Sequence, residues 1–377
     1  MIIQAFLRWV ETARTSDRAR AANALGRAYA QAEINGIDRR AAEMAMTFLL
    51  DDPSPKVRHS LVDALADCPT APRAIIKALA EDQPEIAYVA ISRSAVLNDE
   101  DLVDIAARGT AETRALIAAR STVSRSVAAA IAEIGDEEEV LILLENPGAR
   151  LTQRSLRRIA GRLGHVAAVR DQLLSRGDLP SDARQALAEK VGAALAACGL
   201  VQASIGHGRV QRVAREACDA AALALAAAAP HEELPEMIGH LREAGRLTPS
   251  LLLSALCSGR TEFFSAAIVD LSGVPERRVR SILSGGRIHS IRALLESAGL
   301  GREVSKAFAE AVLLCQGGAG AGADGAPVSI AAELSYRIRR KPSDVSHAIA
   351  ELVERLAFDE QRQIARDYAL LASRQAA

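Results

Sequence analysis

Aromatic side chains are scarce in this sequence, which has six Phe, four Tyr and one Trp among 377 residues. Lysine is also rare and supplies only five of the 46 basic residues. Ala and Leu carry most of the 49% hydrophobic content instead, and both residues favour helices. We therefore expect an all-α fold of small, closely packed helices, with few rings available to stack on nucleic-acid bases.

Long apolar runs are missing as well. The longest, residues 220–229, has ten residues, whereas a membrane-spanning helix needs about 20. The apolar start of the chain, residues 1–7, is too short for the core of a signal peptide. The five cysteines are widely spaced and form no C-x-x-C pair, which is typical of reduced intracellular thiols. These absences predict a soluble cytoplasmic protein without a membrane span.

Familiar catalytic motifs are absent too. The sequence has no G-K-[ST] phosphate loop, no G-x-S-x-G and no His or Cys pair at zinc-binding spacing. Residues 320–325, GAGADG, satisfy G-x-G-x-x-G but lie in a glycine-rich stretch rather than between a strand and a helix. His231 opens an acidic turn, and His240 follows too late for a zinc-binding helix. We predict that the protein is not an enzyme and has no catalytic, cofactor-binding or metal-binding residue. The alternative is a hydrolase whose catalytic residues are distant in the sequence and come together only on folding.

Residues 51–66, DDPSPKVRHSLVDALA, predict a turn followed by a short helix. Ser54 suits the N-cap, and Pro55 suits the first helical position, where a missing N–H costs nothing. The apolar residues that follow recur at helical spacing and form one stripe: Val57, Leu61, Ala64 and Leu65. The Asp-Pro turn followed by Val-Arg is similar to the second helix of a HEAT-like repeat.

Similar units recur downstream. They begin near Asp82, Gly109, Asn146 and Gly177, at successive offsets of 30, 27, 37 and 31 residues counted from Asp52. Each unit follows an apolar helix, so that helices come in pairs. Because one pair cannot bury its apolar face alone, the recurrence predicts an α-solenoid of HEAT-like helix pairs. We expect a right-handed stack over residues 40–315, with no sheet.

Composition divides the chain into four predicted segments. N-terminal helices and HEAT-like repeats occupy residues 1–200, further helical repeats 201–316, a Gly-rich linker 317–326 and a C-terminal helical hairpin 327–377. The hairpin carries a stripe too apolar to stay exposed: Val345, Ile349, Leu352, Val353 and Leu356. Docking on the solenoid or a homodimer through residues 343–371 is expected ahead of a foreign partner.

Charge is segregated, although the whole chain carries a net charge of only −1. Residues 81–145 hold 14 acidic and five basic residues, whereas residues 146–215 hold 12 basic and four acidic ones. Two arginine clusters in the basic block are candidate partner-binding residues: Arg154, Arg157, Arg158 and Arg162 on one helix face, and Arg209, Arg212 and Arg215. Two interpretations are open. The arginines form solvated faces that pair between neighbouring repeats, or they form a basic groove that binds an acidic protein, a phosphorylated protein or nucleic acid.

Two stretches carry a resemblance to a known family. Residues 51–66, together with LTPSLLLSALCSGRTEFFSAAIVDLSGVPERRVRSIL at residues 247–283, resemble an uncharacterised bacterial family of HEAT-like helical-repeat proteins, a domain of unknown function. The resemblance covers residues 40–315. Its motifs are packing and turn residues, so it implies a helical fold and supplies no catalytic residue.

The predicted architecture favours a non-catalytic scaffold or regulatory adaptor that binds another protein on an extended surface. The alternative is a nucleic-acid-binding HEAT-like protein, including one that acts on DNA. The near-neutral net charge and the single Trp count against that alternative.

Overall fold

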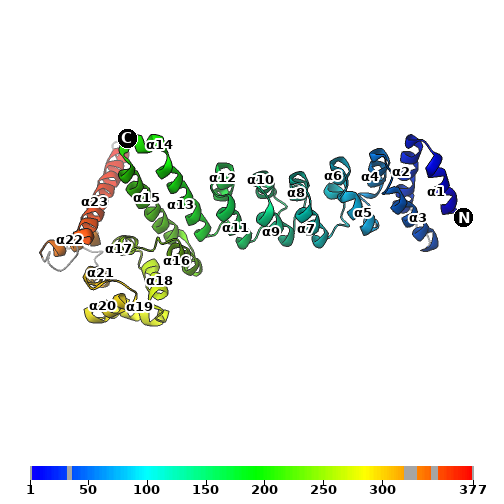
Figure 1. Ribbon diagram of the computed structural model, residues 1–377. Coiled ribbons are helices and arrows are strands. Elements are labelled where there is room, and N and C mark those ends of the chain that lie inside the picture. Colours follow the sequence, from blue (N-terminus) through cyan, green and yellow to red (C-terminus); the bar gives the residue numbers. More distant parts are fainter. Residues whose placement is uncertain (1, 32–35, 318–328, 341–346, 376–377) are drawn as a thin grey trace. The chain divides into compact units, whose positions relative to one another are not determined.

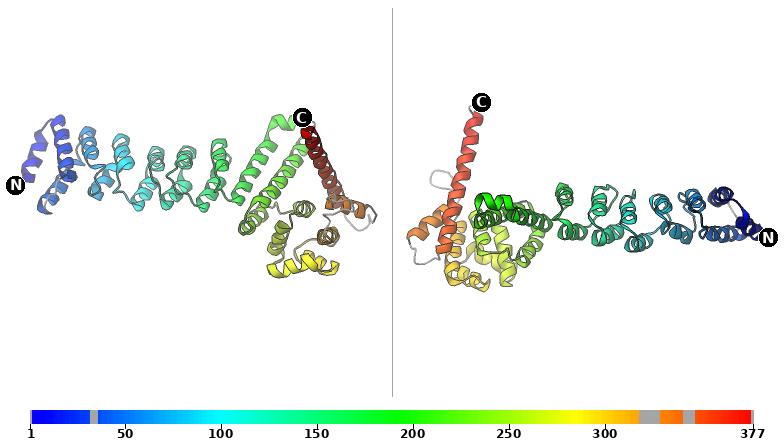
Figure 2. Two further views of the ribbon diagram at one scale, coloured as in Figure 1. Left: turned by 180° about the vertical axis from the view of Figure 1, so that it is seen from behind. Right: turned by 45° about the horizontal axis from the view of Figure 1, so that its top comes forward.

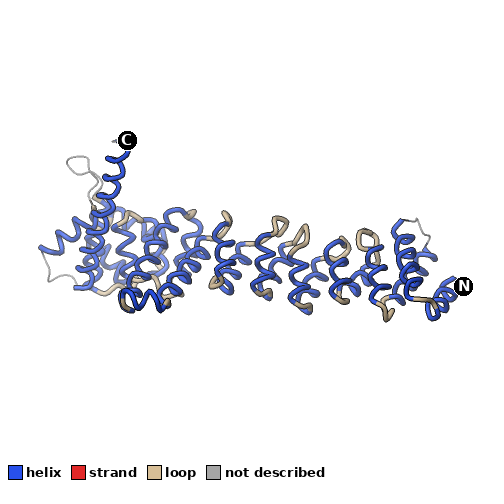
Figure 3. The backbone as a smooth tube through the Cα atoms, turned by 90° about the horizontal axis from the view of Figure 1, so that it is seen from above, coloured by secondary structure: helices blue, strands red, loops and turns tan. Residues whose placement is uncertain are grey.

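The computed structural model describes residues 2–31, 36–317, 329–340 and 347–375. Within these ranges the chain forms 23 α-helices and one 3-10 helix, and no strand (Figure 1, Figure 3). The predicted all-α class is therefore confirmed. In the same ranges, no helix combines the length and the apolar character needed to cross a membrane.

The chain divides into two compact units, Met1–Leu179 (unit 1) and Pro180–Ala377 (unit 2). The sequence suggested a first boundary at residue 200 instead. The division falls earlier because α13 (Ser181–Ala197) packs along α15 (His207–Ala228) and α16 (Leu234–Glu243), which both belong to unit 2.

Unit 1 consists of short helices in two rows. The even-numbered helices α2 to α12 contact one another in order and form one row, while α7, α9 and α11 form a second row beside it (Figure 1). The helices are α1 (Ile2–Thr12), α2 (Thr15–Gln31), α3 (Gly36–Leu49), α4 (Pro55–Leu65), α5 (Arg73–Ala80), α6 (Pro84–Arg93), α7 (Asp99–Arg108), α8 (Ala111–Ala118), α9 (Arg125–Ile134), α10 (Glu137–Glu145), α11 (Gln153–Leu163) and α12 (Ala167–Ser175).

Helix α4 begins as the sequence predicts, with Pro55 at its first position and Ser54 as an extended N-cap residue. The Ser54 side chain makes no capping hydrogen bond; instead Asp52 Oδ1 accepts the Ser54 N–H at 2.9 Å. Val57, Leu61 and Leu65 are fully buried. The predicted apolar stripe therefore faces the core of unit 1.

Helix α10 has no counterpart in the prediction, because the unit predicted near Asn146 corresponds to α11 (Gln153–Leu163). The helix begins at Glu137, and its acidic first turn is a helix cap: Asp136 and Glu139 form a capping box. Carboxylates at a helix N-terminus interact favourably with the helix dipole. The helices α4, α6, α8, α10 and α12 consequently start at spacings of 29, 27, 26 and 30 residues, which are more even than the predicted ones.

Arginine is the fourth residue of four helices in the even-numbered row: Arg18, Arg58, Arg114 and Arg170. Arg58 donates to the carbonyl oxygen of Asp52 at 2.6 Å and to the carboxylate of Asp82 at 2.5 and 2.9 Å. Arg18 and Arg114 make the same two kinds of contact. Each donates to a backbone carbonyl that precedes its own helix. Arg18 also pairs with the carboxylate of Asp52, and Arg114 with that of Glu139, near the start of the next helix in the row. Arg18, Arg58 and Arg114 therefore link consecutive helices of the row.

Unit 2 encloses one large apolar cluster, within which the rings of Phe264 and Phe308 stack 6.0 Å apart. Its remaining elements are α14 (Gly199–Ile205), a 3-10 helix (His231–Glu233), α17 (Pro249–Cys257), α18 (Thr261–Ser272), α19 (Glu276–Gly285), α20 (Ile288–Ser297), α21 (Arg302–Gln316), α22 (Ile330–Arg340) and α23 (His347–Gln375).

The C-terminal helices pack inside unit 2. Helix α23, the long red helix of Figure 2, lies along α22 and also contacts α17. Ile349 and Val353 are buried in the unit 2 core, and Leu352 and Leu356 are partly buried against it. Most of the predicted stripe is thus covered within the chain itself. Val345 and, apart from Gly317, the predicted linker lie outside the described residues.

Candidate binding surfaces

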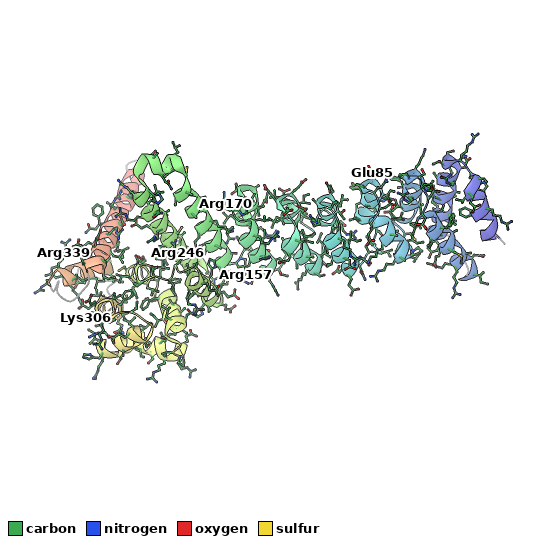
Figure 4. The ribbon with its side chains drawn as sticks, viewed as in Figure 1. Glu85, Arg157, Arg170, Arg246, Lys306 and Arg339 are labelled. Atoms are coloured by element: carbon green, nitrogen blue, oxygen red, sulfur yellow. The ribbon has the colours of Figure 1, made fainter. Side chains whose placement is uncertain are left out.

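The arginine face of α11 forms part of a hollow. Arg154, Arg157 and Arg158 line an open space of about 810 Å³ between α9 and α11, together with Glu133 of α9 (Figure 4 labels Arg157). Arg158 makes a two-pronged ion pair with Glu133, with distances of 2.6 and 2.7 Å. An acidic group of the same chain therefore neutralises one member of the cluster.

Arg162 lies elsewhere. Its guanidinium donates to the carbonyl oxygens of Ala132 at 2.8 Å and Gly135 at 3.1 Å, at the C-terminal end of α9. Carbonyls at a helix end need such donors because they have no partner inside the helix. Arg154 is exposed, and its side chain has no hydrogen bond or ion pair within the described residues. The four arginines thus share a helix but have different surroundings.

The second predicted cluster lies on α15. Arg212 and Arg215 line a hollow of about 460 Å³ with Arg355 of α23 and the N-terminal end of α17, whereas Arg209 is exposed outside it. Arg355 had no signal in the sequence, because only folding brings α23 beside α15.

Acidic side chains share the same hollow. Glu216 pairs with Arg355, and Asp219 pairs with Arg246 at 2.8 Å. Burial raises the pKa of Asp219, and the hydrogen bond from Arg246 only partly opposes this. The hollow therefore combines both signs of charge and is not a simple anion site.

A cavity of about 420 Å³ lies among α17, α18, α19 and α21. Leu256, Phe264 and Val312 give it apolar walls. Ser265 is 8% exposed, and its buried hydroxyl has no hydrogen-bond partner among the described residues. Small-molecule sites are commonly about 300–1,000 Å³ in volume with a few polar groups. The cavity meets this description through its size and the Ser265 hydroxyl.

A catalytic or metal-binding cluster would form from the titratable and metal-ligating side chains of the described residues. These residues contain no group of three or more His, Cys, Asp or Glu able to hold a metal ion. All five cysteines are free, and burial raises the pKa of Cys257 to about 12, so this thiol stays protonated. His231 lies 2.6 Å from a nitrogen of Arg280 and 3.5 Å from Glu262, in an exposed charged cluster.

One exposed apolar stripe is not among the features that the sequence predicts. Ile37, Met44 and Phe48 of α3 are 83%, 61% and 43% exposed, and their spacing places them on one helix face. Met46 and Leu49 of the same helix are fully buried. Because α3 is apolar on two faces, only the packing shows which of them is left exposed.

These surfaces belong to an all-α protein of short helices in which arginines such as Arg58, Arg114 and Arg162 bind carbonyls and carboxylates of the same chain. The chain belongs to the DUF2336 family, described as an uncharacterised protein conserved in bacteria, whose family model matches residues 86–348. The expected uncharacterised bacterial family is thus confirmed, and residues 247–283 lie inside the match whereas residues 51–66 precede it. No curated protein and no solved structure matches the chain.

Proposed function

We propose that this protein is a non-catalytic adaptor of the cytoplasm, in which unit 1 is an α-solenoid of HEAT-like helix pairs that binds another protein. Support comes from the two helix rows and from the arginines that fasten consecutive helices of one row. Free thiols throughout fit a reducing compartment. A stiff array of short helices offers an extended surface to a partner.

The exposed stripe of α3 carries this proposal. Burying apolar surface contributes about 25 cal/mol per Å², so Ile37, Met44 and Phe48 gain from a partner that covers them. Methionine and aromatic residues are also enriched at protein interfaces. One basic side chain lies beside the stripe, since Arg40 is exposed and follows Ile37 by three residues. The matching partner is an amphipathic helix of another protein with acidic residues flanking its apolar face.

The test begins with light scattering on the full chain, where a monomer is expected. Wild type and an M44D/F48D variant then serve as baits in a cytoplasmic extract from the source cells. A protein captured by wild type is purified and its affinity for both baits is measured. We expect a one-to-one complex that the double variant weakens at least about tenfold, because each buried large apolar side chain contributes about 1.5–3 kcal/mol.

A T47D variant is the matched control, because Thr47 is exposed on the same helix but outside the stripe. It should bind like wild type. Equal binding by wild type and M44D/F48D would contradict the proposal. If wild type is a dimer and M44D/F48D is a monomer, the stripe binds a second copy of the chain and not a foreign partner.

A further inference from the structure

The connection between α18 and α19 in unit 2 is a tight turn of three residues, Gly273 to Pro275. Gly273 has a φ of +67°, in the left-handed region, and its N–H bonds to the carbonyl of Val269 at 3.0 Å. Pro275 follows as the N-cap of α19 and accepts hydrogen bonds from the N–H groups of Arg278 and Val279. Two helices joined by a three-residue turn that contains glycine form a helix-turn-helix arrangement.

Helix α19 packs against the unit 2 core through one side only. Val279 is fully buried, and Ile282 and Leu283 are partly buried against the unit 2 core. The other side of the helix is exposed and carries Arg277, Arg278 and Ser281, whereas the exposed residues Arg280 and Ser284 line the cavity among α17, α18, α19 and α21. Figure 1 shows α19 lying crosswise to α18 at an edge of unit 2. The second helix of the motif is therefore free to enter a groove.

The exposed side of α19 and the start of α20 are basic. Residues 273–292 contain five arginines and a single acidic residue, Glu276. Arg280 is neutralised, since it lies 3.0 Å from both Glu262 and Glu276. Arg277, Arg278 and Arg287 are exposed, and their side chains have no hydrogen bond or ion pair in the part of the chain that the structure describes. They differ in this from Arg18, Arg58 and Arg114, which bind groups of their own chain.

We propose that α18 and α19 bind double-stranded DNA, with α19 in the major groove. That groove is about 12 Å wide and admits an α-helix, and the N-terminal residues of the second helix are the ones that reach base edges in this motif. Arg277 and Arg278 occupy those positions in α19. Arg287, at the N-cap of α20, contacts a backbone phosphate beside the groove. This function goes beyond protein binding by unit 1 and uses different residues.

The experiment measures the anisotropy of a labelled 30-base-pair duplex of mixed sequence titrated with the full chain in 50–300 mM salt. Wild type should bind, with an affinity that falls as salt rises. An R277Q/R278Q/R287Q variant should bind at least about tenfold more weakly at the lowest salt, and its salt slope should be smaller by about 0.9 for each phosphate that the protein no longer neutralises. An S281D variant, which keeps every arginine and adds a negative charge to the same face, should also lose binding.

An R8Q/R27Q/R125Q variant is the control, because it removes three exposed arginines from unit 1 instead. It should retain wild-type affinity for the duplex, as should M44D/F48D. The proposal is overturned if wild type binds no duplex at 50 mM salt, or if the unit 1 control weakens binding as much as the α19 variant. Stronger binding of single-stranded RNA that S281D does not affect would overturn it as well.

Discussion

Arg114 of α8 and Glu139 of α10 form an ion pair in which Nε lies 3.0 Å from Oε1 and the Glu139 side chain is only 2% exposed. The same guanidinium donates to the carbonyl of Gly109 at 3.0 Å, and Glu139 also accepts the N–H of Asp136 at 3.1 Å. One arginine therefore links the turn before α8 to the cap of α10. The pair couples two neighbouring helices of the row through buried polar groups rather than through apolar packing alone.

Replacing Arg114 by Met should destabilise unit 1 strongly. The change leaves the Glu139 carboxylate buried without its cation, and breaking a buried pair in this way costs about 3–5 kcal/mol. Trp9 is the single Trp of the sequence and lies in unit 1, so its fluorescence during a urea titration reports on that unit. Arg108→Met is the control, because Arg108 is exposed and lies 3.8 Å from Asp104. Its effect should stay below about 1 kcal/mol. Equal midpoints for the two variants would refute the role given to Arg114.

Two glycines of unit 2 should respond to alanine in opposite directions. Gly273 has a φ of +67° at the turn before α19, and an alanine there is strained by about 1–2 kcal/mol. Gly239 lies inside α16 with open space where a Cβ would stand, so Gly239→Ala should stabilise the helix by about 0.5–1 kcal/mol. Hydrogen exchange of α18, α19 and α16 measures both effects. Faster exchange in α16 of the Gly239 variant, or unchanged exchange around α19 in the Gly273 variant, would contradict this.

Arg154 and Arg162 occupy the same helix but should behave differently as glutamines. Arg162→Gln removes two hydrogen bonds to the end of α9 and should lower the stability of unit 1 by about 1–3 kcal/mol, since each such bond contributes about 0.5–1.5 kcal/mol. Arg154→Gln should leave stability unchanged. If Arg154 binds an acidic partner, its variant instead lowers the affinity for that partner and the salt dependence of binding. The comparison separates a structural arginine from one available to a ligand.

How far the sequence predicts this molecule depends on how local each signal is. Pro55 and the stripe through Val57, Leu61 and Leu65 lie within one helix, and the structure confirms both. Helix α10 was overlooked because its acidic first turn resembles a charged surface run until Arg114 is placed beside Glu139. The surroundings of Arg162 and Arg355 depend on other helices, so helical spacing alone could not distinguish a carbonyl donor from a groove-lining cation. Exposure of the α3 stripe is likewise a result of packing.

His240 should make the stability of unit 2 depend on pH. Its Nε2 lies 3.5 Å from Glu189 Oε2, and Glu189 raises the pKa of His240 although burial opposes the shift. Asp182 and Glu243 also favour the charged form of the His240 ring. Burial would raise the pKa of Glu189, but His240 and Gln185 outweigh it and lower that pKa.

Because the folded state raises the pKa of His240, it binds the proton more tightly than the unfolded chain does. The resulting stabilisation is complete below the unfolded pKa, about 6.5, and is lost as pH rises through the folded pKa. Hydrogen exchange of α13 and α16, with rates corrected for the intrinsic effect of pH, should therefore show less protection at pH 8.5 than at pH 6. A partly exposed pair of this kind contributes up to about 1 kcal/mol. His240→Gln should remove the pH dependence, whereas His207→Gln, at an exposed position on α15, should keep it. If protection in wild type is the same at both pH values, or if His240→Gln keeps the difference, the Glu189–His240 pair does not stabilise unit 2.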